Sequence, residues 1–480
     1  MSNPVVTRFA PSPTGMMHIG GVRTALFAYL WARKNNGTFI LRVEDTDRKR
    51  YVEGAIDHMM ECLKWIGIEW DYGPDKVNPF GSCIQSERLD TYLPFAQKLI
   101  EKGLAYPDPY TAEEVEAFRA ESQAAKKPFL FREHRPETFE KWDGTKPLRF
   151  KVPEVKRSHW HDEVRGDLEA GEESLDDFIL IKSDGYPTYN FAHIIDDYLM
   201  GVTCIMRGQE FIASTPIYLS LYEALEIPCP EFVTLPPILR EDRTKKLGKR
   251  DGAKDFLDYR NEGYLPEAMV NFLVLIGWNP GTERELFTMP ELIKEFDIHK
   301  IQKAGGVLNE EKLSWFNKEY ITRMNDEEFL KYISDALPAE LLAVPERLNH
   351  LLPILRERTA VRSALAKEYA EGEYSWACKT PVLDTAKIIW KDGNFVDTII
   401  HLEHAREAFL TASSWTADSL KASLWDYATE KGRGAVLWPL RYSLTGRDKS
   451  PDPFVVAGIL GKDEVLERLE KVIGQLRLVS

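Results

Sequence analysis

The stretch Arg8-Phe-Ala-Pro-Ser-Pro-Thr-Gly-Met-Met-His-Ile-Gly-Gly21 decides how the chain begins to fold. Val5, Val6 and Phe9 predict a short strand, and from Val22 onward apolar residues recur at helical spacing. The prolines and glycines between these two patterns predict a turn from strand to helix. A strand that passes directly into a helix is typical of parallel α/β sheets, so we expect a doubly layered α/β domain here.

The chemistry of this turn suits a phosphate group. The first N–H groups of a helix and the positive end of its dipole face outward, and Gly20 and Gly21 allow a ligand to approach the main chain. His18 could donate a hydrogen bond to the same ligand. An ordinary turn with a solvated histidine explains these residues equally well, because a lone glycine-rich turn is a weak signal.

A family resemblance favours function. Ala10-Pro-Ser-Pro-Thr-Gly15 followed by His18-Ile-Gly-Gly21 resembles the ATP-binding signature of class I aminoacyl-tRNA synthetases, in the version found in glutamyl-tRNA synthetases of the bacterial type. The resemblance implies a Rossmann-like catalytic domain with a parallel sheet. It assigns catalytic roles to His18, Lys246 and Lys249. The ATP contacts that it implies are Ala10, Ser12, Thr14, His18, Gly20, Gly21, Glu210, Leu247 and Lys249.

Length and composition favour a soluble protein of several domains. The 480 residues predict two to four domains, and 44% of them are hydrophobic. We find no run of about 18 apolar residues, which a membrane-spanning helix needs. Met1–Val6 lead directly into the first strand without a basic segment, so we expect no targeting peptide and a cytoplasmic location.

The net charge and the cysteine spacing argue against two classes of protein, one with a nucleic-acid-binding surface throughout and one held together by disulfides or a thiolate zinc site. The net charge of −14 counts against a surface that binds nucleic acid throughout, but residues 240–254 contain seven Lys or Arg against three Asp or Glu. A local basic patch is therefore possible. The five cysteines are far apart and lack Cys-x-x-Cys spacing, which predicts free thiols rather than disulfides or a thiolate zinc site.

A second strand, residues 38–43, completes a strand-helix-strand unit that should be parallel and right-handed. Glu44-Asp-Thr-Asp47 follows at its carboxyl end, where open α/β sheets place ligand groups. A carboxylate there could hold a substrate ammonium, although a helix cap explains Asp45, Thr46 and Asp47 as well. The resemblance implies that Glu44 accepts the amino group of the substrate.

Residues 105–175 are charged and interrupted by prolines and glycines, with strand patterns at 147–152 and 158–164. We interpret this segment as an α+β insertion, which in the resembled family packs on the tRNA acceptor stem. Some members hold zinc there with cysteines. No cysteine occurs between Cys83 and Cys204, so we expect no zinc, with His134, His159 and His161 as the remaining alternative ligands.

The apolar run at 177–182 is expected to resume the parallel sheet as a strand that is buried on both faces. Tyr186-Pro-Thr-Tyr-Asn-Phe-Ala-His-Ile-Ile-Asp-Asp197 then resembles the family's loop and helix over the amino-acid pocket. Tyr189 and His193 should share one helix face. Tyr189 also fits a core aromatic, and His193 stands where relatives often have asparagine.

Residues 201–210 predict a strand that places Arg207 at its carboxyl end. An acidic amino acid presents two carboxylates and one ammonium, so a matching pocket needs two cationic forks and one anion. Arg8, Arg207 and Glu44 supply this set. A neutral amide would leave the charge of Arg207 desolvated, which favours glutamate over glutamine.

The stretch Lys245-Lys-Leu-Gly-Lys-Arg-Asp-Gly252 resembles the lysine loop of class I synthetases. By that resemblance Lys249 follows the β- and γ-phosphates of ATP as a compact charge. A solvated basic loop and a contact with a nucleic-acid phosphate are the alternatives. Gly248 replaces the serine of the family pattern and removes one hydroxyl donor, so weaker use of ATP is possible.

Helical periodicity dominates after residue 322, without a series of Val- and Thr-rich hairpins. The resemblance implies helical anticodon-binding domains, as in bacterial-type glutamyl enzymes, instead of the β-barrels of glutaminyl enzymes. The expected division is a first catalytic segment at 1–104, the insertion at 105–175, a second catalytic segment at 176–240, a stem-contact domain with the lysine loop at 241–321, and anticodon-binding domains at 322–480.

The resemblance thus implies a ligase that uses ATP and Mg²⁺ to form glutamyl-adenylate from L-glutamate and transfers glutamate to the 3′ end of tRNA(Glu). We expect a monomer without membrane contact. The alternatives are a glutaminyl-tRNA synthetase and, given Gly248, a catalytically weak paralogue that binds tRNA or a nucleotide. A shorter relative that modifies a tRNA base lacks the anticodon domain, which this chain should have.

Overall fold

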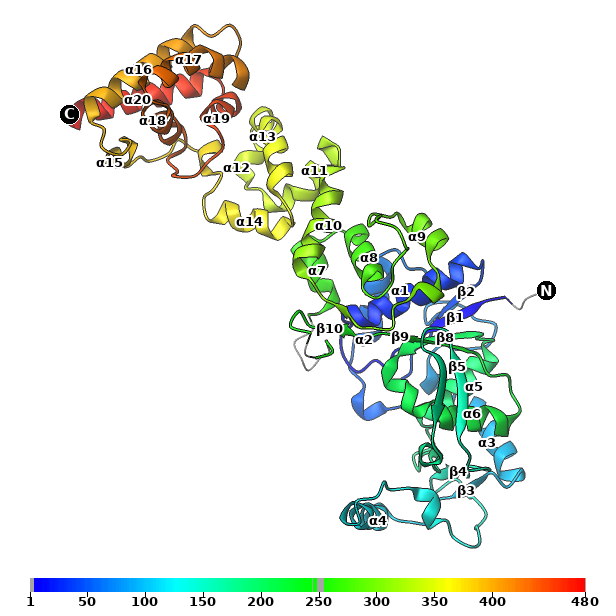
Figure 1. Ribbon diagram of the computed structural model, residues 1–480. Coiled ribbons are helices and arrows are strands. Elements are labelled where there is room, and N and C mark those ends of the chain that lie inside the picture. The colour runs from blue at the N-terminus through cyan, green and yellow to red at the C-terminus, as the bar shows by residue number, and fades with distance from the viewer. Residues whose placement is uncertain (1–3, 244, 248–253, 480) are drawn as a thin grey trace. The chain divides into compact units, whose positions relative to one another are not determined.

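The computed structural model describes residues 4–243, 245–247 and 254–479. It divides into two compact units, the first comprising Met1–Asn261 with Leu265–Phe316 and the second Glu262–Tyr264 with Asn317–Ser480. Each unit has its own core, and the two are described separately below (Figure 1).

A parallel sheet of four strands is the centre of the first unit. Its order is β2-β1-β8-β9, and each neighbouring pair is parallel. The strands are β1 Val6–Phe9, β2 Thr38–Leu41, β8 Cys204–Gly208 and β9 Glu231–Leu235. One helix separates β1 from β2 in the sequence, and the two strands pair in parallel. The expected parallel strand-helix-strand unit is therefore confirmed.

That helix, α1 Ile19–Lys34, is buried along most of its length. Leu26, Phe27 and Ala28 are completely buried. Asn35 is the C-cap of this helix, and the following Asn36 adopts φ 50°, a left-handed conformation that asparagine tolerates well and that ends the helix.

Helices cover both faces of the parallel sheet. α1 lies on one side with α8 Pro266–Leu275 and α9 Met289–Glu295. On the other side α3 Leu89–Glu101, α5 Tyr189–Leu199 and α6 Thr215–Leu225 pack around a second apolar core (Figure 1). The remaining helices of this unit are α2 Ala55–Trp65, α4 Ala112–Ala124, α7 Phe256–Glu262 and the start of α10 Glu310–Thr322.

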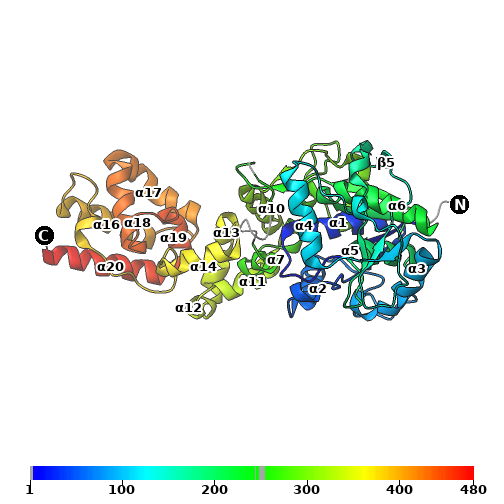
Figure 2. The same cartoon turned by 90° about the horizontal axis from the view of Figure 1, so that it is seen from below.

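The insertion forms its own antiparallel sheet in the order β3-β4-β7. Its strands are β3 Ala105–Pro107, β4 Leu148–Phe150 and β7 Ile179–Ile181. α4 lies at the outer end of this sheet in Figure 1 and faces the viewer in Figure 2. The prediction that residues 177–182 resume the parallel sheet is wrong. Three apolar residues, two of them buried, fit a strand of either sheet, and here β7 hydrogen-bonds to β4 of the insertion.

A hairpin returns from the insertion to the parallel sheet. It consists of β5 Ser158–Asp162 and β6 Gly166–Ala170. The strand pattern expected at 158–164 contains β5 and the one expected at 147–152 contains β4, whereas β6 was not predicted. Glu163 N–H donates to the carbonyl of Phe232, and the carboxylate of Asp162 accepts from the hydroxyl of Thr234. The far end of the insertion is thus fixed to β9.

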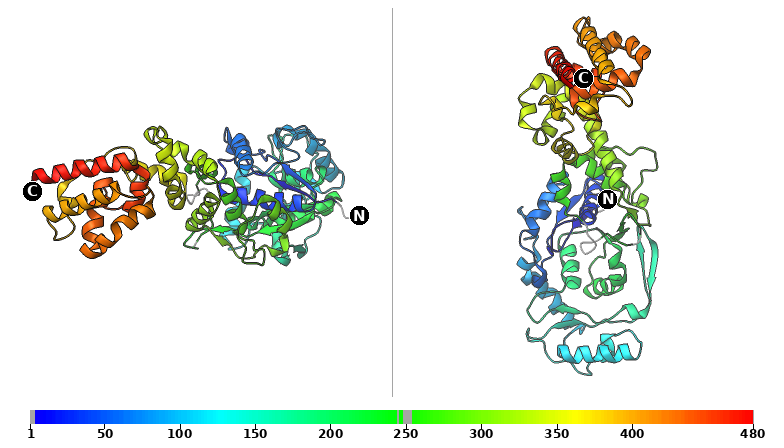
Figure 3. Two further views of the ribbon diagram at one scale, coloured as in Figure 1. Left: turned by 90° about the horizontal axis from the view of Figure 1, so that it is seen from above. Right: turned by 90° about the vertical axis from the view of Figure 1, so that its left-hand side faces the viewer.

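The second unit is built from helices, and the described part of it contains no strand. This confirms the helical interpretation of the sequence after residue 322. Its last helices, α16 to α20, pack against one another as a bundle (Figure 3, left). After the end of α10, the α-helices in the described part of this unit are α11 Asp326–Ile333, α12 Ala339–Leu342, α13 Pro345–Arg358, α14 Arg362–Ala370, α15 Thr385–Ile388, α16 Phe395–Leu410, α17 Ala417–Lys431, α18 Arg433–Thr445, α19 Pro453–Leu460 and α20 Lys462–Val479.

Within the described ranges no helix is both long and apolar enough to cross a membrane.

Candidate nucleotide and amino-acid site

The turn after β1 delivers His18 to the start of α1. His18 is the N-cap residue, and its Nδ1 accepts a hydrogen bond of 3.1 Å from the N–H of Gly20. A Cβ at position 20 would lie 2.8 Å from the imidazole Cε1, so only glycine leaves room for the ring in this position. The imidazole is therefore held over the helix N-terminus, where the main chain and the dipole favour an anion.

A cavity of about 310 Å³ opens beside this N-terminus at the carboxyl ends of β8 and β9. It brings together six of the residues predicted to act on ATP. These are His18, Gly20, Gly21, Glu210, Lys246 and Leu247. The described residues that line the cavity do not include Ala10, Ser12 or Thr14, which lie in the turn itself, where Thr14 N–H donates to Ser12 O at 2.8 Å. Lys249 and Gly248 lie outside the described residues.

The basic stretch is rooted beside this cavity. Leu247 N–H donates to Ile238 O at 2.8 Å, so residues 245–247 run antiparallel to β10 Ile238–Leu239. Lys246 Nζ lies 2.9 Å from a carboxylate oxygen of Glu210, and both side chains are about half exposed. Lys246 and Glu210, which were both predicted to contact ATP, therefore form an ion pair with each other in the protein without ligand.

Arg23 is a cavity residue that sequence reasoning missed. It is 3% exposed, and its guanidinium donates to the carbonyl oxygens of Ile276, at 2.9 Å, and Pro236. Burial lowers the pKa of Arg23 to about 10. A charged residue in the first turn of an otherwise apolar helix was the available signal, because a buried charge needs partners.

The residues predicted to bind the amino acid lie in a network of buried charges. Arg8 Nε lies 3.1 Å from Asp197 Oδ1, and Arg42 bridges Asp197 at 2.7 Å and Glu44 at 2.9 Å. All four side chains are at most 5% exposed. Arg8 and Glu44, which the sequence predicted as substrate ligands, are therefore joined through two residues that it did not single out. Arg42 was detectable as a charge inside a strand that is otherwise apolar.

The network sets the charge of its carboxylates. Burial alone would raise the pKa of Asp197, but the guanidiniums of Arg42 and Arg8 hold that pKa well below its usual range. At Glu44 burial is the larger effect and raises the pKa to about 7, against the attraction of the same two arginines. Asp197 is therefore a fixed anion, whereas Glu44 titrates near neutral pH.

Arg207 lies at the carboxyl end of β8, as predicted. Its Nη2 donates to Thr215 Oγ1 at 2.9 Å, and the guanidinium lies 5.1 Å from the ring centre of Tyr218 and 4.8 Å from that of Phe232. Its buried Nη1 has no hydrogen-bond partner among the described residues. Burial lowers the pKa of Arg207. A buried cation with an unused donor needs an anionic partner.

Tyr189 and His193 share one face of α5, as predicted, with ring centres 4.8 Å apart. Burial, and then the charge of Glu44, raises the pKa of Tyr189, while Arg8 and Arg207 act against it. The charges of Glu44, Arg8 and Arg207, the three residues predicted to bind the substrate, therefore all act on the phenol of Tyr189. Burial lowers the pKa of His193 to about 4, so its ring is neutral at pH 7. Neither ring nitrogen of His193 has a hydrogen-bond partner among the described residues.

The three insertion histidines have neighbours other than a metal. His134 stacks on Phe118 at 4.2 Å between ring centres, and His161 Nδ1 lies 2.7 Å from Asp167 Oδ1. Across the described residues there is no group of three or more His, Cys, Asp or Glu side chains placed to hold a metal ion. All five cysteines are free thiols, as predicted.

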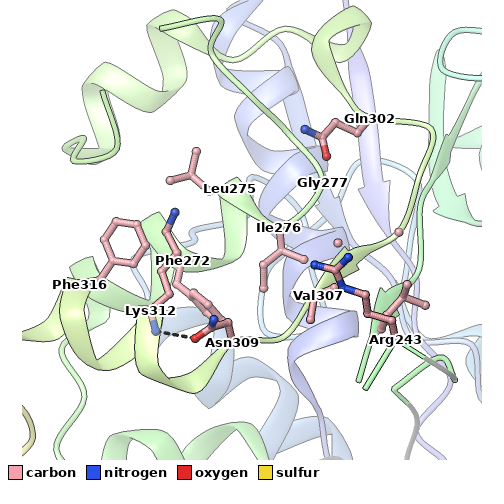
Figure 4. Close-up of a pocket in the computed structure, with 13 residues that line it drawn as sticks. Arg243, Phe272, Leu275, Ile276, Gly277, Gln302, Val307, Asn309, Lys312 and Phe316 are labelled. Atoms are coloured by element: carbon pink, nitrogen blue, oxygen red, sulfur yellow. Dashed lines mark hydrogen bonds between the residues drawn. The ribbon is translucent and has the colours of Figure 1, made fainter. Parts of the chain in front are cut away.

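A second cavity, of about 400 Å³, lies between the end of α8, β11 Gly306–Val307 and the start of α10. Figure 4 shows the side chains that line it, including Arg243 and Lys312. Lys312 is paired with Glu285. β11 pairs in parallel with β10, so this cavity adjoins the strand that leads into the basic stretch.

A parallel sheet with a phosphate-type helix N-terminus and a polar pocket at the strand carboxyl ends defines an α/β enzyme of the nucleotide-binding class. Residues 4–315 match the family described as "tRNA synthetases class I (E and Q), catalytic domain", and residues 327–473 match "Anticodon binding domain". The chain therefore belongs to the E and Q family of class I tRNA synthetases.

Individual relatives match over their whole length. The chain is 39% identical to a glutamate–tRNA ligase of Clostridium botulinum over 496 residues, covering 100% of both proteins. It is 37% identical to one of Christiangramia forsetii, covering 99% of this chain and 100% of the relative. A crystal structure of a glutamate tRNA ligase from Elizabethkingia meningosepticum in complex with its amino acid is 34% identical, with a TM-score of 0.87 over 99% of this chain and 100% of that one.

Proposed function

We propose that this chain is a glutamate–tRNA ligase, which activates L-glutamate with ATP and transfers it to the 3′ end of tRNA(Glu). The full-length relatives at 37–39% identity bear that name. The observation that carries the proposal is the buried Arg207, whose Nη1 has no partner among the described residues. A substrate carboxylate would complete its hydrogen bonds, whereas the amide of glutamine would leave its charge uncompensated.

The remaining pocket residues fit the other groups of the substrate. Glu44 would accept the ammonium, Arg8 would add a second cation near the carboxylates, and Tyr189 would form a wall between them. His193 is neutral at pH 7, so it adds no third positive charge to this pocket. These roles extend the sequence-based assignment and remain open to test residue by residue.

The reaction needs positioning and charge stabilisation rather than a protein nucleophile. The α-carboxylate of glutamate attacks the α-phosphate of ATP, the bond to the β-phosphate breaks, and pyrophosphate leaves. A hydroxyl of the terminal ribose of tRNA then attacks the glutamyl carbonyl, and AMP leaves. His18 and the N-terminus of α1 would bind the phosphates in the cavity beside them, and Lys246 and Lys249 would offset the charge that develops on pyrophosphate.

Mg²⁺ fits this cavity as a metal that arrives with the nucleotide. Among the described residues that line it, Glu210 is the one carboxylate, and it is paired with Lys246. Mg²⁺ in nucleotide sites is held largely by phosphate oxygens and water, so a single protein carboxylate is compatible with it. When bound, the ion would neutralise part of the phosphate charge. We further propose that the protein is a cytoplasmic monomer and contains no structural zinc.

Pyrophosphate exchange from labelled ATP tests the proposal, with glutamate or glutamine as substrate and with or without tRNA(Glu). We expect exchange that depends on glutamate, and aminoacylation of tRNA(Glu). Equal use of glutamine would favour a glutaminyl enzyme. Binding of tRNA without exchange under any condition would favour the catalytically weak paralogue.

A further inference from the structure

One histidine outside the predicted site contacts both the turn that carries His18 and the segment that follows the basic stretch. His58 lies on α2, four residues into the helix, and its side chain is 12% exposed. Its Nδ1 accepts a hydrogen bond of 3.3 Å from the N–H of Met17, the residue immediately before His18. Its Nε2 lies 2.8 Å from Oδ1 of Asp255, which follows the basic stretch in the sequence.

The two hydrogen bonds define one state of the ring. Because Nδ1 accepts from an amide, the proton must be on Nε2, which donates to the carboxylate. The neutral imidazole is therefore the only form that makes both bonds. Protonation of Nδ1, or loss of the ring, breaks the link to Met17.

The link is reinforced by the main chain. Phe256 N–H donates to Met17 O at 2.9 Å, so Met17 is bonded through both its amide and its carbonyl. Asp255 also accepts from Leu257 N–H at 2.9 Å, which fixes its carboxylate at the start of α7. His58 thus holds the turn that carries His18 against the start of α7, which follows the basic stretch in the sequence.

We infer that His58 is a positioning residue, which sets the distance between the His18 turn and the segment that follows the basic stretch. This inference rests on the proposed function, in which both motifs act on the phosphates of ATP. His58 touches no substrate. It acts through Met17 and Asp255, and a shift of about 1 Å between phosphate-binding groups is enough to slow a reaction of this kind severely.

The chain contains a matched control for this inference. Arg260 Nη1 lies 2.8 Å from Glu61 Oε1, so this pair also joins α2 to α7, but it contacts neither Met17 nor Asp255 in the described structure. If docking of the two helices were the whole effect, breaking either pair would have the same result. If His58 positions the two segments, loss of its hydrogen bonds should slow the reaction, whereas loss of the Arg260–Glu61 pair should not.

Four variants of the full-length protein, with Glu61→Gln as the control, separate the two bonds in steady-state pyrophosphate exchange with glutamate and tRNA. His58→Ala breaks both bonds, and we expect kcat to fall about tenfold with a higher KM for ATP, the effect of losing one or two hydrogen bonds. His58→Asn retains an acceptor for Met17, and His58→Gln retains a donor for Asp255. Both should be intermediate. Asp255→Asn, which retains an acceptor, should stay near wild type, and Glu61→Gln should stay within twofold of wild type.

Amide hydrogen exchange provides a readout that does not depend on activity. The amides of Met17 and Phe256 should exchange faster in His58→Ala than in wild type and Glu61→Gln, while the amides of α1 stay protected. Melting temperatures identify any variant that has lost its fold, and the Asn and Gln variants then replace His58→Ala.

The outcomes distinguish this inference from the proposed function. A wild-type protein without any exchange of pyrophosphate would contradict the function, and amide exchange would still decide whether His58 holds the two segments. An active wild type with His58→Ala within twofold of it would overturn the inference alone. An equal loss in Glu61→Gln would also overturn it, because helix docking would then explain the effect.

Discussion

The two sides of the site lie at the carboxyl ends of one sheet but are built in opposite ways. On the side proposed to bind ATP, called the ATP side below, His18, Lys246 and Glu210 are partly exposed, and a main-chain contact with Gly20 places His18. On the amino-acid side Arg8, Arg42, Glu44 and Asp197 are buried and hold one another. A group placed by the main chain can be removed with little effect on folding. A buried charge cannot be removed without loss of stability, because its partner is left buried and unpaired.

The strongest test of this contrast removes the central carboxylate. Asp197→Ala leaves Arg8 and Arg42 without their shared partner, so we expect the free energy of unfolding to fall by about 3–5 kcal/mol. Urea denaturation measures it. Asp196→Ala is the matched control, because Asp196 is equally buried but pairs with Arg88, Gln85 and Tyr92. Both variants should be destabilised, but only Asp197→Ala should also raise the KM for glutamate. A fully stable Asp197→Ala protein would contradict the network.

The ATP side should show the reverse pattern. His18→Ala should slow adenylate formation about 10²-fold, because it removes a preorganised phosphate donor. Its stability should change by only about 1 kcal/mol, the usual effect of a lost helix cap. Lys249→Ala should slow the same step to a similar extent, a prediction from the sequence alone. Single-turnover rates close to wild type in both variants would show that the phosphates bind elsewhere.

Specificity should depend on the arginine with the unused donor. A charged hydrogen bond contributes on the order of 1.5–3 kcal/mol, so Arg207→Cys should lose about 10- to 150-fold of the preference for glutamate over glutamine. The measurement is aminoacylation with both amino acids in competition, expressed as the ratio of the two kcat/KM values. A ratio within about twofold of wild type would make Arg207 a structural residue.

The smallest expected effect concerns pH. Glu44 must lose its proton to accept the substrate ammonium, and burial raises its pKa to about 7. Its ionised fraction should rise about tenfold between pH 6 and pH 8, so the KM for glutamate should fall by up to that factor as pH increases. Glu44→Gln should have a higher KM with a flatter profile over this range. A wild-type KM that rises with pH would contradict the assignment.

The sequence predicted the parts of this fold that depend on local pattern. The strand-turn-helix at Arg8–Gly21, the position of Arg207 at a strand end and the shared helix face of Tyr189 and His193 all follow from the spacing of neighbouring residues. Partners distant in sequence were not predictable in the same way. The strand Ile179–Ile181 was assigned to the wrong sheet because its three apolar residues do not specify a neighbour.

The missed residues share one property, which is that their function depends on where other segments lie. Arg42 and Arg23 were visible as charges within apolar elements, but nothing in the sequence identified Asp197, Ile276 or Pro236 as their partners. His58 gave no signal at all, because it stands in an ordinary amphipathic helix. Its partners Met17 and Asp255 flank motifs that are far apart in the chain.

The order of the parallel sheet has a consequence for synthesis of the protein. One of the two neighbours of β1 is β8, and Val6 bonds to Thr203, 197 positions later. At about 5–20 residues per second a ribosome needs roughly 10–40 s to make that segment. During this interval one edge of β1 lacks its strand partner, whereas the insertion sheet of β3, β4 and β7 can pair as soon as residue 181 emerges. We therefore expect the insertion to fold first on the nascent chain and the parallel sheet to be completed afterwards, with one edge of β1 open to wrong pairing until then.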